Sequence, residues 1–159
     1  MYNLSELNIS STLISNNLAT NRGAGICSFN ASLNIDECAI TENEVVGGQG
    51  GAMYFTVGGE LEELPEVVIS NTVISYNIGS ESGASAGAIF LKPEEFPSFY
   101  IHIENCIFEG NISKSNTALS ITGDLGLKII NCSFLSNEAE QYTAGIAFTS
   151  GCSGERISC

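Results

Sequence analysis

The sequence is poor in positive charge. It has 5 Lys+Arg against 18 Asp+Glu in 159 residues, which gives a formal net charge of −13. The basic residues are scattered along the chain, at Arg22, Lys92, Lys114, Lys128 and Arg156. Because nucleic-acid binding needs Lys and Arg clustered on one surface, we expect no nucleic-acid partner.

Long apolar runs are also missing, and the chain has one His, no Trp and 3 Pro. No run approaches the roughly 20 apolar residues of a membrane helix, so no membrane span is expected. Residues 1–6 have neither the basic segment nor the apolar core of a signal peptide. The chain contains instead 17 Gly, 15 Asn and 20 Ser. This composition favours short strands joined by tight turns, in one domain.

A nine-residue motif recurs five times. The segments at 103–111 and 129–137 both fit I-x-N-C-x-F-x-x-N, and weaker copies at 9–17, 35–43 and 69–77 align with them without gaps. Each copy begins with Ile and ends with Asn, and the intervals between the terminal Asn residues are 26, 34, 34 and 26 residues. The longer intervals contain the 26-residue unit plus an insertion. A fixed repeat of this kind is typical of a solenoid.

A second motif follows most copies. It reads A-G-I-C at 24–27, G-A-M-Y-F at 51–55, G-A-I-F-L at 87–91 and A-G-I-A-F at 144–148. Glycine permits close backbone packing at a bend, and we align these segments on one glycine column: Gly25, Gly51, Gly87 and Gly145. The same alignment puts Cys27 in a column with Met53 and Ile89.

The apolar residues of the repeat alternate, as in Leu7/Ile9 and Ile101/Ile103, which indicates strands and not helices. Three short strands and three turns fill the 26 residues of one unit, as in one coil of a parallel β-helix. We therefore predict an all-β fold, a right-handed parallel β-helix (a solenoid) of about five coils with two inserted loops. The coils occupy residues 1–149, and residues 150–159 form a C-terminal tail or partial cap.

The terminal Asn of each motif copy has a structural explanation. Asn tolerates the left-handed backbone of a sharp bend, and equivalent residues stack directly in a solenoid. Stacked side-chain amides donate to one neighbour and accept from the other. We therefore predict an interior ladder of Asn17, Asn43, Asn77, Asn111 and Asn137.

The two motifs resemble those of known surface proteins. The F-x-x-N segments at 108–111 and 134–137, with Gly-Gly-Ala-Met at 50–53 and Ala-Gly-Ala-Ile at 86–89, resemble the repeats of chlamydial polymorphic outer membrane proteins. More broadly they are similar to pectin-lyase-like β-helix repeats in large extracellular proteins of bacteria and protists. The resemblance covers most of the chain and implies a β-helix in an extracellular or cell-surface setting, with an adhesive role.

The six cysteines leave several states open. Only Cys106 and Cys132 fall in the same column of adjacent coils, where a Cα separation of about 4.8 Å suits either a disulfide or a pair of stacked thiols. Cys152 and Cys159 lie outside the repeat and are the second candidate pair, whose bridge would indicate an oxidising compartment. A zinc site is not favoured, because the cysteines are dispersed and His102 is the only His.

Glycosylation sequons occur at Asn3, Asn8 and Asn30. Asn111 also begins a sequon but is assigned to the interior ladder. The alternative is that sequons arise by chance in a chain rich in Asn and Ser. If the chain is secreted, Asn3, Asn8 and Asn30 are the expected sites.

Two insertions, at 58–66 and 92–100, follow the glycine-containing strand in successive coils and hold all 3 prolines. They occupy equivalent places, so we expect them to project side by side. Carboxylates are the ligands that Ca²⁺ prefers, and candidate calcium ligands are Glu60, Glu62, Glu63, Glu66, Glu94 and Glu95. The alternative is a pair of solvated loops, with Phe96, Phe99 and Tyr100 either packed beneath them or facing a neighbouring molecule.

The sequence favours a non-enzymatic structural or adhesive module. Alternation begins at Leu7 without a preceding helical cap, so we expect a segment of a longer solenoid, or a unit that stacks end to end with copies of itself into a filament. The alternative is a polysaccharide-binding or polysaccharide-degrading β-helix. Surface glycans would bind exposed aromatic side chains, for which Tyr54, Tyr76 and Tyr142 are the candidates.

Catalytic chemistry on polysaccharides asks for paired carboxylates or a base beside acidic residues. The only two Asp residues, Asp36 and Asp124, lie about three coils apart in the predicted fold. We therefore assign no catalytic residue, expect no enzyme, and expect no cofactor other than calcium.

Overall fold

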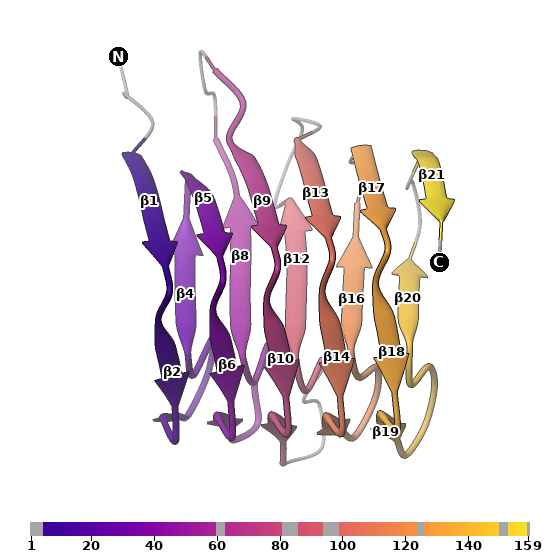
Figure 1. Ribbon diagram of the computed structural model, residues 1–159. Helices are drawn as coiled ribbons and strands as arrows, with labels where there is room; N and C mark the ends of the chain where they lie inside the picture. Colours follow the sequence, from indigo (N-terminus) through magenta and orange to yellow (C-terminus); the bar gives the residue numbers. More distant parts are fainter. Residues whose placement is uncertain are drawn as a thin grey trace.

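The computed structural model describes residues 5–59, 63–80, 86–93, 99–123, 126–149 and 153–158. Within these ranges the chain forms 21 strands and no helix. The described segments accordingly include no helix that could cross a membrane. The strands wind in successive coils around one axis, and each coil stacks on the one before it (Figure 1).

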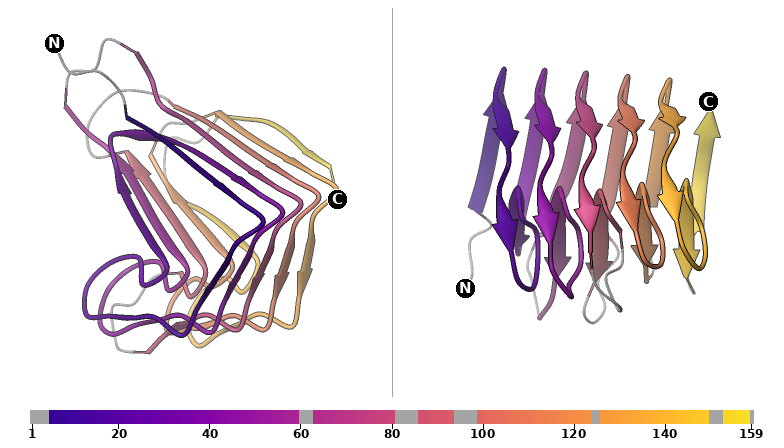
Figure 2. Two further views of the ribbon diagram at one scale, coloured as in Figure 1. Left: turned by 60° about the vertical axis from the view of Figure 1, so that its left-hand side comes forward. Right: turned by 90° about the horizontal axis from the view of Figure 1, so that it is seen from below.

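Equivalent strands of successive coils pair in parallel and form four sheets along the solenoid (Figure 2). Sheet 1 contains β1 (Ser5–Ser10), β5 (Ala31–Asp36), β9 (Glu66–Ser70), β13 (Tyr100–Glu104), β17 (Gly126–Ile130) and β21 (Ser153–Ser158). Sheet 2 contains β2 (Leu13–Ser15), β6 (Ala39–Thr41), β10 (Val73–Ser75), β14 (Ile107–Glu109) and β18 (Ser133–Leu135).

The other two sheets complete each coil. Sheet 3 contains the two-residue strands β3 (Leu18–Ala19), β7 (Glu44–Val45), β11 (Ile78–Gly79), β15 (Ile112–Ser113) and β19 (Glu138–Ala139). Sheet 4 contains β4 (Ile26–Phe29), β8 (Met53–Val57), β12 (Ile89–Pro93), β16 (Leu119–Thr122) and β20 (Ile146–Thr149).

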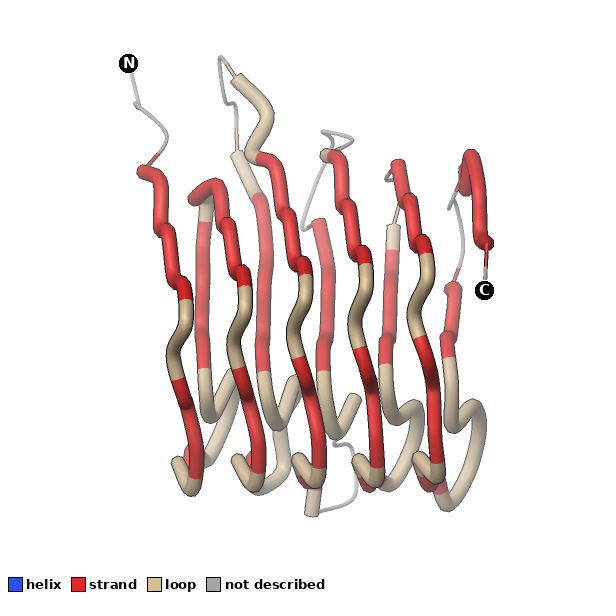
Figure 3. The backbone as a smooth tube through the Cα atoms, viewed as in Figure 1, coloured by secondary structure: helices blue, strands red, loops and turns tan. Residues whose placement is uncertain are grey.

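The predicted parallel β-helix of about five coils is confirmed. A coil has four strands and not the expected three, because the chain forms a further two-residue strand directly after the bend at each terminal Asn. Short loops separate the sheets at these bends (Figure 3). The division into coils at 1–149 and a tail at 150–159 stays a prediction; the backbone of β21 pairs in parallel with β17.

The core is a single stack of inward-facing apolar side chains. In β5 the inward residues Leu33 and Ile35 are buried, and in β8 so are Met53, Phe55 and Val57. Such alternation is what a half-buried strand requires.

The register of sheet 4 shows that the predicted position of Cys27 is wrong. Met53 pairs with Ile26 on one side and Ile89 on the other, whereas Cys27 pairs with Tyr54. Cys27 therefore faces outward and is exposed. Burial of the inward apolar residue decides the register, and a slip of one residue would turn that residue outward.

The glycines consequently fall in two columns and not in one. Gly51 and Gly87 are equivalent, and Gly25 and Gly145 lie one position later. A Cβ atom on Gly51 would lie 2.2 Å from the carbonyl oxygen of Gly87, and one on Gly87 would lie 2.3 Å from that of Ile112. Close backbone packing at this bend is therefore real, although a Cβ on Gly145 would meet nothing within 4 Å.

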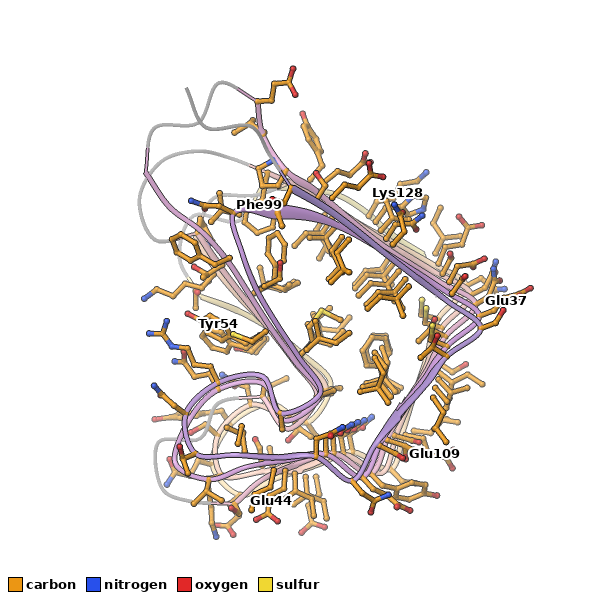
Figure 4. All side chains as sticks on the ribbon, turned by 90° about the vertical axis from the view of Figure 1, so that its left-hand side faces the viewer. Glu37, Glu44, Tyr54, Phe99, Glu109 and Lys128 are labelled. Carbon is orange, nitrogen blue, oxygen red and sulfur yellow. The ribbon has the colours of Figure 1, made fainter. Side chains whose placement is uncertain are left out.

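The second insertion brings one aromatic side chain into the core and leaves another outside. Phe99 is fully buried, and its ring packs on Phe55 with the centroids 5.2 Å apart (Figure 4). Tyr100 begins β13 and is 64% exposed on the outer face of sheet 1. Phe96 lies outside the described residues.

The terminal Asn residues form the predicted ladder. The Nδ2 atoms of Asn17, Asn43, Asn77 and Asn111 donate to Oδ1 of the Asn in the next coil, at 2.8, 3.0, 3.0 and 2.9 Å. Their backbone N–H groups donate to the same oxygens. The three central side chains are fully buried, whereas Asn17 is exposed and Asn137 half-buried because they lie in the first and last of the five coils.

A second Asn ladder runs along the outside, which the sequence reasoning missed. Asn131 donates to Asn105 at 2.7 Å, Asn105 to Asn71 at 3.3 Å, and Asn71 to Asp36 at 2.8 Å. The three Asn residues have left-handed φ values of 49°, 55° and 50°. Their shared third position in the motif was the available signal.

Replacing Asn77 with Ala should destabilise the fold strongly. The change leaves the buried amide of Asn43 and the carbonyl of Ile40 without their partners, at about 1–3 kcal/mol for each group. We expect the free energy of unfolding, measured by urea denaturation, to fall by about 3 kcal/mol or more. Asn17→Ala, at the exposed end of the ladder, is the control and should lose about 1 kcal/mol. Equal losses in the two variants would contradict a buried ladder.

Candidate functional site

The outer face of sheet 1 carries the described part of the chain's most varied chemistry. Its outward side chains form three columns that cross the coils. The column that ends in Lys128 and Arg156 is Asn8, Asn34, Val68, His102, Lys128 and Arg156. Figure 4 shows Lys128 projecting outward from this face.

The basic residues are less scattered than their sequence positions suggest. His102 of β13 pairs in register with Lys128 of β17, which pairs with Arg156 of β21. Stacking of adjacent coils thus puts half of the six His, Lys and Arg residues of the chain in one column. The intervals of 26 and 28 residues between these three residues follow the coil length, with one extra residue at the β-bulge after Leu127.

Tyr100 lies over a glycine of the next coil. A Cβ atom on Gly126 would lie 2.6 Å from Cδ1 of Tyr100, so only glycine leaves room for the ring in this position. The ring forms one side of a hollow of about 340 Å³ that is also lined by Glu66, His102 and Lys128. An exposed aromatic ring beside acidic and basic side chains is an arrangement suited to a polar ligand with an apolar face.

His102 also faces a carboxylate of its own strand. Its Nε2 atom lies 3.1 Å from Oε2 of Glu104, two residues later on the same outer face. The imidazole and the carboxylate together offer a donor and acceptor pair next to the Tyr100 ring. This pair is the one place on the described face where a base stands beside an acidic group and a Lys.

A second, more acidic hollow of about 500 Å³ lies over the first three coils. Its charged lining residues are Glu6, Glu63 and Glu66. Of the six glutamates proposed to bind calcium, only Glu63 and Glu66 are described; Glu60, Glu62, Glu94 and Glu95 lie outside. No group of three or more metal-ligating side chains occurs among the described residues. Calcium binding stays a prediction.

Of the aromatic residues expected to bind glycans, Tyr54 is placed differently by the structure. It points outward from sheet 4 but is only 1% exposed, because it stacks on Phe90 with the ring centroids 5.8 Å apart and is covered by the guanidinium of Arg22 (Figure 4). Tyr76 and Tyr142 are exposed, although they lie away from the Tyr100 hollow.

Cys106 and Cys132 are free thiols in adjacent coils. A hydrogen bond between the two side chains lowers the pKa of Cys132 to about 7 and raises that of Cys106, which stays the protonated member. Both also lie within hydrogen-bond distance of backbone carbonyls two residues earlier, at 3.2 Å. Cys152 and Cys159, the other candidate pair, lie outside the described residues.

The sequon residues have unequal freedom. Both polar atoms of the Asn30 side chain bond to the backbone of Gly58, each at 2.8 Å. Asn8 is exposed and contacts only the side chain of Glu6, at 3.1 Å. Asn3 lies outside the described residues.

Comparison with protein families matches residues 5–158 to the right-handed β-helix region. The chain belongs to this family. The comparisons with curated proteins and with solved structures found no match. Function in this right-handed β-helix therefore has to be inferred from its own outer faces and ends.

Replacing Asp36 with Asn should remove a pH-dependent contribution to stability. Hydrogen bonds from Ser70 at 2.7 Å and Asn71 at 2.8 Å hold the pKa of Asp36 below its ordinary value. A lowered pKa stabilises the fold above the ordinary Asp value and loses that effect as the pH falls through the folded value. Urea unfolding at about pH 7 and about pH 3 should show a gap between wild type and Asp36→Asn that narrows at the lower pH. A gap of equal size at both values would contradict this.

Proposed function

We propose that this right-handed β-helix is a non-enzymatic adhesive module of a cell-surface or extracellular protein, and that it binds a glycan on the outer face of sheet 1. The observation that carries the proposal is the hollow in which the Tyr100 ring lies over Gly126 beside His102 and Lys128. A sugar ring has an apolar face for the aromatic ring, and hydroxyl groups for the charged side chains around it.

The charge of the face limits which glycan fits. The chain as a whole carries −13, so a long anionic polymer is repelled at a distance. Within the face, the column His102–Lys128–Arg156 is where a carboxylate or sulfate would be accepted, whereas Glu66 suits a neutral hydroxyl. A short glycan, neutral or with a single acidic group, matches this distribution.

The cell-surface setting rests on the sequence. The resemblance of the repeats to those of surface and extracellular proteins supports it, as do the sequons. The rigid β-helix suits such a role, because its stacked strands hold the outward columns in fixed register.

The binding proposal predicts loss of affinity when Tyr100 is changed. We expect the wild-type chain to bind at least one member of an array of neutral and uronate-containing oligosaccharides. Tyr100→Ala should weaken that binding at least about tenfold, the effect of losing a contact worth about 1.4 kcal/mol. Gly126→Ala should weaken it as well, because the new methyl group displaces the ring.

Matched controls lie on other faces. Tyr142→Ala removes a tyrosine that is also exposed, and Lys114→Gln changes the charge as Lys128→Gln does, at a Lys paired with Glu140. Both controls should bind like wild type. If Tyr100→Ala and Lys128→Gln also bind like wild type, the outer face of sheet 1 is not the glycan site.

A polysaccharide lyase is the second candidate, and the geometry of His102 favours it. A base next to Glu104 and one coil from Lys128 is the minimum equipment for abstracting a proton beside a uronate carboxyl group. Turnover of polygalacturonate, followed by absorbance of the unsaturated product and abolished in His102→Ala, would replace the adhesive proposal with this one.

Secretion of the chain from a glycosylating host should modify Asn8 and not Asn30. The Asn8 amide is accessible, whereas modification of Asn30 has to break two hydrogen bonds with Gly58. Peptide mass spectrometry after secretion measures the occupancy of each site. Equal occupancy at the two sites would mean that modification precedes the formation of the Gly58 contact.

A further inference from the structure

The two ends of the solenoid differ by one strand. At the first end, β1, β2, β3 and β4 are all edge strands of their sheets. At the other end, sheets 2, 3 and 4 finish with β18, β19 and β20, whereas sheet 1 continues from β17 to β21. The second end therefore has a step, one strand high, over sheet 1.

The interior Asn ladder makes these ends complementary. Every ladder residue that has a following coil donates both its backbone N–H and its Nδ2 to the next Oδ1, as Asn111 does to Asn137 at 3.1 and 2.9 Å. Among the described residues, Oδ1 of Asn17 accepts no hydrogen bond, and the backbone N–H of Asn137 has no acceptor. One end offers the acceptor and the other the donor of the same bond.

The apolar core is open at the same places. Leu7 faces inward at the first end and is 41% exposed, and Ile14 is half-buried. At the other end Phe134 stacks on Phe108 at 4.7 Å and is half-buried. In contrast, Leu127 of β17 is only 2% exposed, since β21 covers this part of the core.

The position of β21 is the one that β1 of a second copy would need. A copy stacked flush, with its β2 on β18, places its β1 directly on β17, where β21 already pairs. A copy stacked on top of β21 leaves one layer empty over the other three sheets. Its Asn17 then lies about 4.8 Å too far from Asn137 for a hydrogen bond.

We propose that the edge formed by β17, β18, β19 and β20 is a docking surface for the β1–β4 edge of a second copy of this chain, and that β21 occupies the contested place on β17. A strand tethered to the same chain has an effective concentration on the order of millimolar. It therefore excludes a second copy at micromolar protein concentration, and the chain stays monomeric while β21 is paired. This inference is independent of the proposed glycan binding.

Deletion of residues 150–159 tests the proposal. Sedimentation velocity and electron microscopy, in reductant so that Cys152 and Cys159 form no cross-link, should show wild type as a monomer and the truncated chain as end-to-end oligomers. Circular dichroism establishes that the truncated chain keeps its strands. Where truncation prevents folding, Ile157→Pro in the full chain serves instead, because proline removes a backbone N–H from β21 and disrupts its pairing with β17.

Two neighbouring residues provide a matched pair within the truncated chain. Ile14→Lys puts a charge on the inward side of β2, at the docking surface, and should abolish the oligomers. Leu13→Lys adds the same charge on the outward side, where the residue is 65% exposed, and should leave them intact. A folded, monomeric truncated chain overturns the docking surface, as do equal effects of the two Lys variants. Wild-type chain that stacks as readily as the truncated chain overturns the role of β21.

Discussion

The structure depends on one requirement: a buried amide side chain must have hydrogen-bond partners on both sides. Asn43, Asn77 and Asn111 are fully buried, and each is satisfied by the same residue one coil away. An unpaired buried amide costs more than most single packing contacts contribute. The coils are therefore held in a single register, and insertions are accepted only where they leave the ladder in place, as in the 34-residue intervals.

The register that stacks the ladder also arranges the outside of the molecule. Tyr100 meets Gly126, and His102, Lys128 and Arg156 align, because β13, β17 and β21 are neighbours in sheet 1. These residues are separated in sequence by about one coil length each. A surface with paired chemical groups thus follows from a constraint in the interior, and changes in coil length would dissolve the proposed site before they altered any of its residues.

Much of this fold was predictable, because the repeated Asn reports the constraint directly. The ladder and the number of coils followed from five Asn residues at fixed positions. The column of Cys27 did not, since the alignment followed glycine, which tolerates a shift, and not the apolar residue whose burial decides the register. The exposure of Tyr54 and the grouping of the basic residues depend on neighbours one coil away, so sequence proximity gave no sign of them.

The same constraint has its weakest point at the ends. A ladder in which each coil satisfies the one before it always leaves an acceptor at one end and a donor at the other, here Asn17 and Asn137. No rearrangement within the coils removes this polarity, because all the bonds of the ladder run in one direction. The outer ladder runs the opposite way and leaves the opposite groups unpaired. Each end therefore presents donors and acceptors whose natural complement is another coil of the same kind, and β21 supplies such a complement for only one of the four sheets.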